Sequence, residues 1–250
     1  MSGVFGIEFS PLTQSQLVSE LADGRIPEGA GPRTVVTANL DHVAHLSNNA
    51  DFRTAYKRAW AVTADGMPVF VYAKLRGAAG PARVPGSDLV AALLPALSPA
   101  ADRIFFVVSN WQTGRKLQAF LVSRGFRRSQ VRFEVPSFGF EGDAAFSDQL
   151  ADRIRRHGTT HLVFGLGAPK SEVWIDRHRD RLGNCYGLCV GAGLDFFAGT
   201  KRRAPRWMRK SGIEWLWRLS QEPKRLWYRY TVHAWLFLAA VKDDLIANKQ

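Results

Sequence analysis

Polar residues follow two short apolar runs in the first third of the chain. Thr37 and Asn39 come just after the run TVV, and Asp65 follows a second apolar run and precedes Gly66. A carboxylate placed above a sheet and partly removed from water can take a proton from a hydroxyl group. Asp65 is therefore a candidate general base, although an aspartate before a glycine is also a common turn former or helix cap.

A second segment combines a basic residue with a glycine ahead of an expected helix. Arg83 and Gly86 precede the apolar run DLVAALLPAL, and Ser87 stands directly before it. A cation beside a helix N-terminus is suited to binding an anion. An ordinary loop with Ser87 as the helix N-cap fits the same residues.

The segment FGLGAPKSEVW is a stronger candidate for an anion site. An apolar run ends in glycines at Gly165 and Gly167, and Pro169 predicts the first residue of a helix. Free backbone N–H groups, the helix dipole and the charge of Lys170 would favour a diphosphate here. The spacing gives neither a GxxxxGK[ST] phosphate loop nor a complete dinucleotide fingerprint, and a tight strand-to-helix turn remains the alternative.

A further glycine-rich stretch, VGAGLDFFAG, follows the last apolar run of the chain. Gly191 and Gly193 would let the backbone approach a ligand closely. Asp195 lies in the same stretch and joins the candidate binding residues.

Metal chemistry finds little support in the sequence. His42 and His45 share one helical face, but no carboxylate or third histidine completes a set of ligands. Cys185 and Cys189 lie in an apolar stretch, so two buried thiols in a reducing cytoplasm are expected. We predict no metal and no cofactor.

The bulk composition predicts a globular protein with anionic partners. The 250 residues are 46% hydrophobic and carry a formal net charge of +12. Such a surplus favours nucleic acid, acidic lipid headgroups or phosphorylated substrates. No run reaches the ~18 apolar residues that would span a bilayer, and the N-terminal residues do not resemble a signal peptide. We expect a cytoplasmic protein that is soluble or peripheral to the membrane.

Apolar runs and helical patterns alternate along most of the chain. This order predicts an α/β fold with a mainly parallel, Rossmann-like sheet flanked by helices. Strands are expected at residues 34–38, 61–63, 103–109, 131–135, 161–166 and 185–190. Helices are expected at residues 41–59, 68–75, 87–97, 113–124, 144–157 and 169–182. Ligands of such sheets bind at the carboxyl ends of the strands.

The character of the sequence changes after Gly199. Residues 200–250 hold twelve Lys or Arg against four acidic residues, a surplus of +8, and five of the eight tryptophans. We therefore divide the chain into an α/β core, residues 1–199, and a helical appendage, residues 200–250. Arg218, Arg225 and Arg229 would share one helical face if the helix is continuous, with Glu222-Pro223 as a point of interruption. Interleaved Trp and Arg fit an anionic membrane surface, and a solvated helix pair is the alternative.

Taken together, the ordered blocks TANLDH, TADGMPVF, RVPGSDL, FGLGAPKSEVW, VGAGLDFFAGTKRRAP and GIEWLWRLSQEPKRLWYR resemble the WecG/TagA/CpsF glycosyltransferase family. The resemblance covers about residues 34–229. It implies inverting, metal-independent transfer of a sugar from a UDP-sugar to a polyprenyl-diphosphate-linked saccharide, in the synthesis of cell-surface polysaccharide. It also implies a peripheral position on the inner face of the bacterial plasma membrane, with the appendage docked there and helping to complete the active site.

The resemblance also assigns roles to individual residues. Asp65 matches the base proposed for the family, Thr37 and Asn39 match polar residues of the same pocket, and Arg83 matches a basic residue of the active site. The segment that ends at Glu172 would lie beside the nucleotide donor.

One residue departs from the pattern, because Ser171 stands where the family usually has Gln. The shorter hydroxyl reaches less far than an amide, which leaves the donor identity open.

With no DxD-type metal motif, departing UDP must be stabilised by backbone N–H groups and cations. Lys170, Arg218, Arg225 and Arg229 are available, and arginine is well shaped for diphosphate oxygens.

Two other functions remain open: a nucleic-acid-binding module that uses the basic, aromatic tail, and a non-catalytic partner of a polysaccharide assembly complex. We favour the enzyme and expect no nucleic acid partner. The transferred sugar, the acceptor saccharide and the oligomeric state, a homo-oligomer included, stay open.

Overall fold

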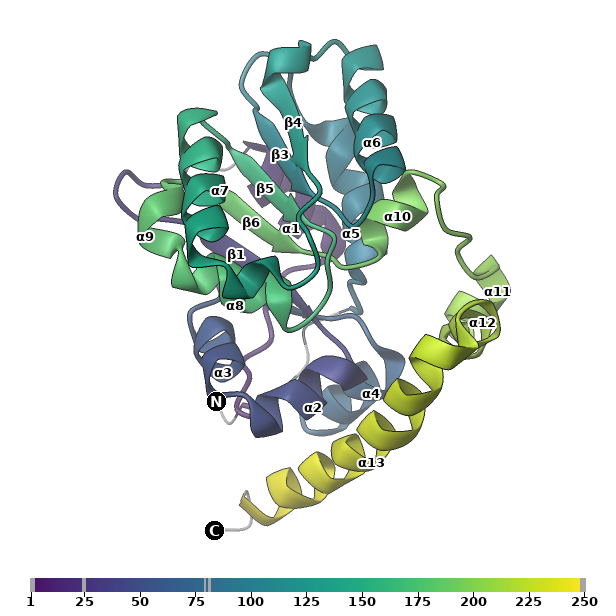
Figure 1. Ribbon diagram of the computed structural model, residues 1–250. Coiled ribbons are helices and arrows are strands. Elements are labelled where there is room, and N and C mark those ends of the chain that lie inside the picture. The colour runs from purple at the N-terminus through teal and green to yellow at the C-terminus, as the bar shows by residue number, and fades with distance from the viewer. Residues whose placement is uncertain (1–2, 24–25, 79, 81, 248–250) are drawn as a thin grey trace.

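A six-stranded sheet forms the centre of the protein (Figure 1). The computed structural model describes residues 3–23, 26–78, 80 and 82–247. All five strand pairings are parallel, in the order β2-β1-β6-β5-β3-β4. The strands are β1 (Arg33–Ala38), β2 (Ala61–Ala64), β3 (Ile104–Val107), β4 (Val131–Glu134), β5 (His161–Phe164) and β6 (Tyr186–Cys189). The expected α/β class and all six strands are confirmed.

Helices cover both faces of the sheet, and each face has its own hydrophobic core. On one face the core contains Phe164 of the sheet and Trp174 of a covering helix. The helices on this face are α2 (Leu40–Asn48), α3 (Ala50–Lys57), α7 (Ala144–Arg156), α8 (Lys170–Arg177) and α9 (Arg179–Leu182). On the other face Phe106 packs with Leu89 and Leu117. The helices there are α1 (Gln14–Asp23), α5 (Gly86–Leu93), α6 (Trp111–Ser123) and α10 (Gly193–Phe197). Strands buried on both faces explain the uninterrupted apolar runs of the sequence.

Short elements complete the core. Helix α4 (Met67–Leu75) follows β2, and three 3-10 turns occupy Leu94–Ala96, Arg128–Gln130 and Phe140–Gly142. Helix α1 was not predicted, since Leu17 and Leu21 are its only fully buried apolar residues.

Local capping corrects three of the expected helices. The helix expected at residues 41–59 is two helices, because the Asn49 side chain accepts a hydrogen bond from Phe52 N (2.9 Å) and starts α3. The helix expected at residues 169–182 is also two, divided at His178. Ser87 is not an N-cap. Helix α5 begins one residue earlier, at Gly86, because Pro85 has extended backbone and takes the cap position.

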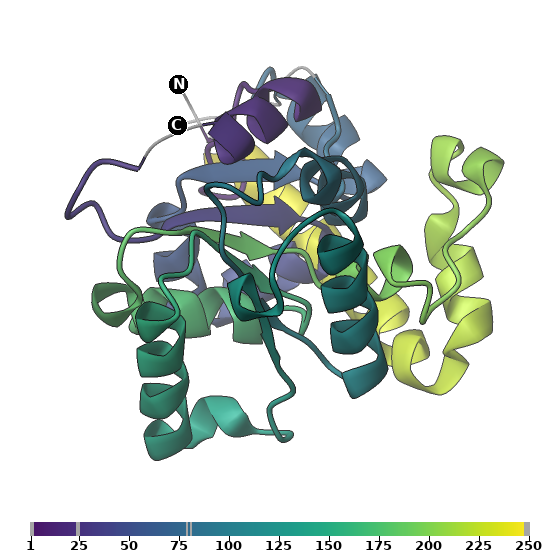
Figure 2. The same ribbon diagram turned by 90° about the horizontal axis from the view of Figure 1, so that it is seen from above.

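The C-terminal segment, residues 200–247, forms three helices that run along the side of the core (Figures 1 and 2). They are α11 (Arg206–Lys210), α12 (Glu214–Gln221) and α13 (Pro223–Ala247). Pro223 opens α13, at the point where an interruption was expected. Phe237 is buried against the core, and Asp244 accepts hydrogen bonds from Tyr72 Oη and Phe5 N, both at 2.8 Å. The division into residues 1–199 and 200–250 stays a prediction, with its boundary between α10 and α11.

Candidate active site

A cavity of about 390 Å³ opens at the carboxyl ends of the central strands. Residues that follow four different strands line it: Asn39 after β1, Asp65 after β2, Gly167 after β5 and Gly191 after β6. The C-terminal segment supplies another wall, with Glu214, Trp215 and Arg218 from α12 and Ala234 from α13. The core and the C-terminal segment therefore form the walls of the cavity together.

Asp65 stands on the turn between β2 and α4. Its backbone N–H donates to Ala38 O (2.8 Å), and Arg83 Nη1 donates to its carbonyl oxygen (3.1 Å). Burial raises the pKa of the Asp65 carboxyl to about 6, with a contribution from Glu214, while Arg218 and Arg83 oppose the rise. Such a carboxylate is mostly ionised at neutral pH yet more basic than an exposed aspartate, which suits a general base.

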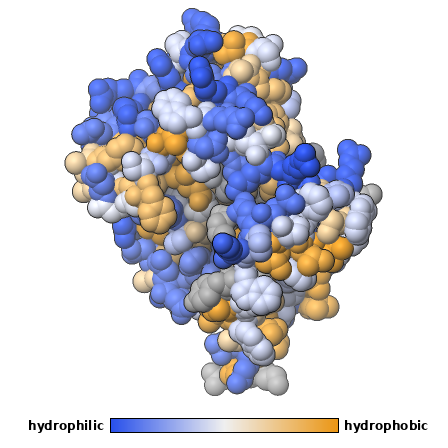
Figure 3. Space-filling model, turned by 45° about the vertical axis from the view of Figure 1, so that its right-hand side comes forward, coloured by the Kyte–Doolittle hydropathy of each residue, from blue (hydrophilic) through white to orange (hydrophobic). Residues whose placement is uncertain are grey.

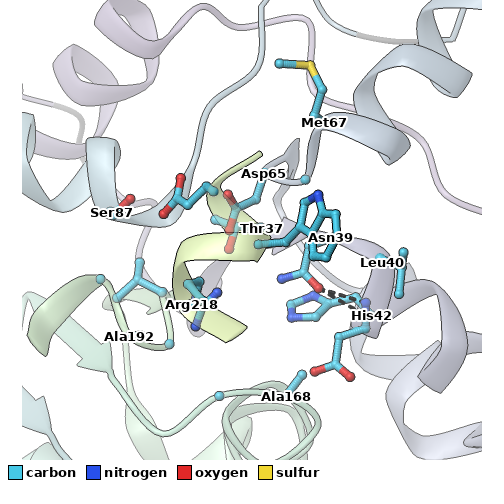
Figure 4. Close-up of a pocket in the computed structure, with 18 of the residues that line it drawn as sticks. Thr37, Asn39, Leu40, His42, Asp65, Met67, Ser87, Ala168, Ala192 and Arg218 are labelled. Atoms are coloured by element: carbon cyan, nitrogen blue, oxygen red, sulfur yellow. Dashed lines mark hydrogen bonds between the residues drawn. The ribbon is translucent and has the colours of Figure 1, made fainter. Parts of the chain in front are cut away.

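Thr37 and Asn39 are fixed by the ends of β1 and α2. The buried Thr37 hydroxyl donates to Cys189 O (3.3 Å), across to β6. Asn39 is the N-cap of α2, and its Oδ1 accepts from Asp41 N (2.9 Å). Its amide nitrogen points into the cavity toward Arg218 (Figure 4). The cap therefore fixes the orientation of the Asn39 amide, and the N–H groups of this amide can donate hydrogen bonds to a ligand.

Two arginines bring positive charge to the Asp65 side of the cavity. Arg83 also donates to Arg209 O (3.4 Å), so one guanidinium joins the Asp65 turn to α11. Arg218 reaches the cavity from α12 and lies 5.8 Å from the centroid of the Phe196 ring.

The sequence was compared with known proteins. The profile of the glycosyl transferase WecG/TagA/CpsF family matches residues 3–250. The chain belongs to this family. It is 25% identical over 227 residues to an N-acetylglucosaminyldiphosphoundecaprenol N-acetyl-beta-D-mannosaminyltransferase of Staphylococcus aureus strain MRSA252, covering 89% of this chain and 85% of the relative. The protein of the same name from strain MW2 is 24% identical over the same shares.

The structure gathers most of the residues that the sequence and the WecG/TagA/CpsF resemblance singled out. The following predicted residues line the cavity: Thr37, Asn39, Asp65, Arg83, Gly167, Glu172, Gly191, Gly193 and Arg218. Gly86 and Gly165 lie just behind its wall. A Cβ atom at Gly86 would be 3.2 Å from Thr37 Oγ1, and one at Gly165 would be 3.0 Å from Leu194 Cδ1. Their role is to permit close packing beneath the site.

Three other predicted residues lie outside the cavity lining. Lys170 forms an ion pair with Glu141 (2.6 Å), and its Nζ lies 4.3 Å from the centroid of the Phe138 ring. Asp195 is buried and accepts from Thr113 Oγ1 (2.7 Å), which ties α10 to α6. Pro169, expected as the first residue of a helix, is instead the N-cap of α8, which begins at Lys170, and it follows a cis peptide bond. The position of the Lys170 side chain could not be predicted from local sequence, because its partner Glu141 belongs to the 3-10 turn Phe140–Gly142, which is distant in the chain.

The helix that would give the three arginines a common face is not continuous, because it is interrupted at Glu222-Pro223. Arg218 belongs to α12, which ends at Gln221, whereas Arg225 and Arg229 follow in α13. The side chains of Arg225 and Arg229 lie outside the described residues.

Ser171, which departs from the WecG/TagA/CpsF pattern, is buried and donates to Gly167 O (3.4 Å). Its hydroxyl therefore supports the loop before α8 and does not line the cavity.

Sequence reasoning missed several lining residues, notably His42, Phe196 and Trp215. His42 was considered only as a metal ligand. The hydrogen bond between its Nδ1 atom and the buried Tyr56 hydroxyl could not be predicted from the spacing of the two residues in the sequence. Within the described residues, no group of three or more His, Cys, Asp or Glu could hold a metal ion, and no helix is long and apolar enough to cross a membrane.

Proposed function

We propose that this glycosyltransferase moves a sugar from a UDP-sugar to a saccharide carried on polyprenyl diphosphate, with inversion at the anomeric carbon and without a metal ion. The names of the S. aureus relatives support the acceptor class and make N-acetylmannosamine the first candidate for the sugar. The observation that carries the proposal is Asp65, a carboxylate of raised pKa in a cavity that also holds arginines.

Asp65 acts as the general base. Its carboxylate takes the proton of an acceptor hydroxyl while that oxygen forms a bond to the anomeric carbon of the donor. The bond from the anomeric carbon to the diphosphate breaks, and UDP leaves with the electron pair. Attack from the side opposite the leaving group inverts the configuration, so a single carboxylate on the acceptor side is sufficient.

Arginine supplies the charge that the leaving group requires. Arg218 and Arg83 line the same cavity as Asp65, and a guanidinium group can donate paired hydrogen bonds to diphosphate oxygens. Because Arg218 comes from the C-terminal segment, the leaving-group site is complete only when that segment is in place. The backbone N–H of Gly191 adds a neutral donor, whereas that of Gly193 already donates to Val190 O (2.9 Å).

The C-terminal segment also fits the surface that carries such an acceptor. Trp207, Trp215, Trp227 and Trp235 are all exposed, and they alternate with cationic residues. Figure 3 shows hydrophobic residues at the lower right of the visible face as well as in its upper half, in both places among hydrophilic ones. Indole rings at headgroup level and cations against anionic lipid would hold the protein on the inner face of the membrane.

Purified protein tests the reaction directly. A panel of UDP-sugars is offered with a short-chain polyprenyl-diphosphate saccharide and EDTA. We expect turnover of one donor, release of UDP, and a product of inverted configuration. Asp65→Asn should bind UDP as the wild type does and lose at least a thousandfold in kcat. Glu141→Gln, a carboxyl change outside the cavity, is the matched control. UDP binding with no turnover of any donor would favour a non-catalytic partner in polysaccharide assembly.

A further inference from the structure

A second cavity, of about 310 Å³, adjoins the first and has no part in the mechanism above. Ala192, Phe196 and Arg218 line both cavities. The other walls of the second cavity come from the loop after α10, from α12 and from the start of α13. The C-terminal segment therefore builds most of this cavity and shares Arg218 between it and the candidate active site.

Among the described residues, cations outnumber acids in the lining of the second cavity. Lys201, Arg202 and Arg218 line it together with Glu222. Lys201 Nζ donates to Glu222 Oε1 (2.8 Å) and lies 4.0 Å from Asp195 Oδ2, so these two carboxylates hold the lysine and offset part of its charge. The Arg202 side chain is exposed. The guanidinium groups of Arg202 and Arg218 can therefore pair with an anion in this cavity.

The first cavity has a different balance of charge. Arg83 and Arg218 line it with four carboxyl groups, those of Asp41, Asp65, Glu172 and Glu214. His233 and His45 lie beside Asp41 and can offset its charge. Burial raises the pKa of Glu172 to about 7, so its charge is only partial at neutral pH. Even with these reductions, the first cavity has too few cations for the diphosphates of both substrates.

The proposed transfer needs a place for each of two diphosphates, one in the UDP-sugar and one in the lipid-linked acceptor. A nucleotide on a parallel sheet binds at the carboxyl ends of the strands, and Gly167 and Gly191, which follow β5 and β6, line the first cavity. The donor therefore belongs there. The acceptor must bring a saccharide hydroxyl to Asp65, and its diphosphate is attached elsewhere on the same saccharide. An adjoining cavity is where that diphosphate can lie.

We propose that the second cavity binds the diphosphate of the polyprenyl-linked acceptor, with Arg202 and Lys201 as its ligands beside Arg218. This inference rests on the proposed function and adds the place where the acceptor is held. Arginine and lysine donate charge-assisted hydrogen bonds to phosphate oxygens. Trp217 Nε1 donates to Arg202 O (3.2 Å) and so fixes the backbone of this residue. Trp217 and Leu226 also line the cavity and offer the start of the polyprenyl chain an apolar wall.

Charge-removing variants of the full chain test the assignment. Arg202→Gln removes an exposed guanidinium and keeps the backbone contact with Trp217, and Lys201→Gln removes a second cation. Arg206→Gln, which removes an exposed cation of α11 outside both cavity linings, is the matched control. We expect Arg202→Gln to raise the KM for the short-chain acceptor five- to tenfold, and the double variant to raise it at least fiftyfold. The KM for the UDP-sugar and the Kd of UDP should change less than twofold.

A second acceptor tests the contact with the diphosphate itself. A monophosphate analogue with the same saccharide and chain lacks one of the two phosphate groups. The wild type should prefer the diphosphate acceptor at least tenfold in kcat/KM, and Arg202→Gln should lose most of this preference. A variant that is only less well folded would lose activity on both acceptors by the same factor, so an unchanged preference would contradict the assignment.

Other outcomes would also overturn the inference. Weaker UDP binding in Arg202→Gln, with an unchanged KM for the acceptor, would assign the second cavity to the donor. An equal rise of the acceptor KM in Arg206→Gln would show general attraction between the basic segment and an anionic lipid. A wild type that turns over no donor refutes the proposed function itself. A wild type that turns over a donor and an Arg202→Gln variant that matches its acceptor KM refute the inference alone.

Discussion

Single residues in this cavity derive their chemistry from their neighbours. Burial raises the pKa of Asp65 to about 6, although three arginines act in the opposite direction. An aspartate at the surface would be ionised but weakly basic, and one buried without cations would be protonated at neutral pH. The observed balance keeps the carboxylate ionised and basic. Two of the arginines that limit the rise, Arg218 and Arg83, are also the residues that we propose for the diphosphate.

The pH dependence of turnover follows from this pKa. A general base acts only when it is deprotonated, so lowering the pH through about 6 removes the active form of Asp65. We expect kcat/KM to fall about tenfold per pH unit below pH 6 and to level off above pH 7. Rates at acceptor concentrations well below KM, between pH 4.5 and 8.5, measure this profile. Because Glu172 titrates in the same range, the Glu172→Gln variant is measured in parallel and should keep the acidic limb. A flat profile down to pH 5 would contradict Asp65 as the base.

How much of the site was predictable depends on the reach of each side chain. Thr37, Asn39 and Asp65 were predictable because Thr37 lies near the end of β1 and the other two follow strands, and parallel strands bring their carboxyl ends to one edge. Lys170 also follows a strand, but its long side chain extends away to Glu141. Glu172 entered only through the family resemblance. Its burial beside the cavity is a property of three-dimensional packing that no local pattern contains.

At the scale of elements, α5 joins the core to the C-terminal segment. Asp88, in the first turn of α5, forms ion pairs with Arg203 (2.6 Å) and Arg209 (3.5 Å), both from that segment. Gly193 adds close packing on the same helix, since a Cβ atom there would lie 3.1 Å from Ser87 Cα. These contacts hold α11 at the rim of the cavity and so support the position of α12, which carries Arg218.

Loss of the Asp88 ion pairs should therefore loosen the C-terminal segment without unfolding the core. We expect Asp88→Asn to lower kcat/KM five- to twentyfold and to speed tryptic cleavage within residues 200–222, because two guanidinium groups lose a partly buried partner. The melting temperature should change by no more than a few degrees. Asp148→Asn, which removes the Arg181 ion pair on the core surface, is the control. Unchanged proteolysis in Asp88→Asn would show that other contacts hold the segment.

Elements were easier to predict than their boundaries. Strands β2, β3, β5 and β6 were evident because a fully buried parallel strand is mostly apolar, whereas the edge strand β4 is partly exposed and contains Arg132 and Glu134. The division of the helix expected at residues 41–59 depends on one side-chain cap at Asn49, and an asparagine within a helical pattern gives only a weak signal. Helix α1 buries only two leucines fully and so lacks a pattern strong enough to predict it.

The whole molecule is asymmetric in charge and in exposed aromatic residues. Residues 200–250 carry +8 of the net +12, and exposed tryptophans lie on α11, α12 and α13. The same helices complete the cavity. Docking of this segment on a membrane would place the cavity wall beside the lipid that carries the acceptor. A nucleic-acid-binding module would use the same cations but would have no use for Asp65 and Glu172 in an enclosed cavity.

Vesicle binding tests this asymmetry. The double variant Trp227→Ala and Trp235→Ala removes two rings that are 64% and 75% exposed on α13. We expect wild-type protein to sediment with phosphatidylglycerol-containing vesicles, the double variant to bind at least tenfold more weakly, and 0.5 M salt to weaken both. Trp111→Ala removes a ring that is 67% exposed on α6 of the core, and this variant should bind as the wild type does.

Binding to single-stranded RNA is measured in the same buffers. Tight, salt-sensitive RNA binding with weak vesicle binding would assign the basic segment to nucleic acid and would remove the membrane from the proposed function.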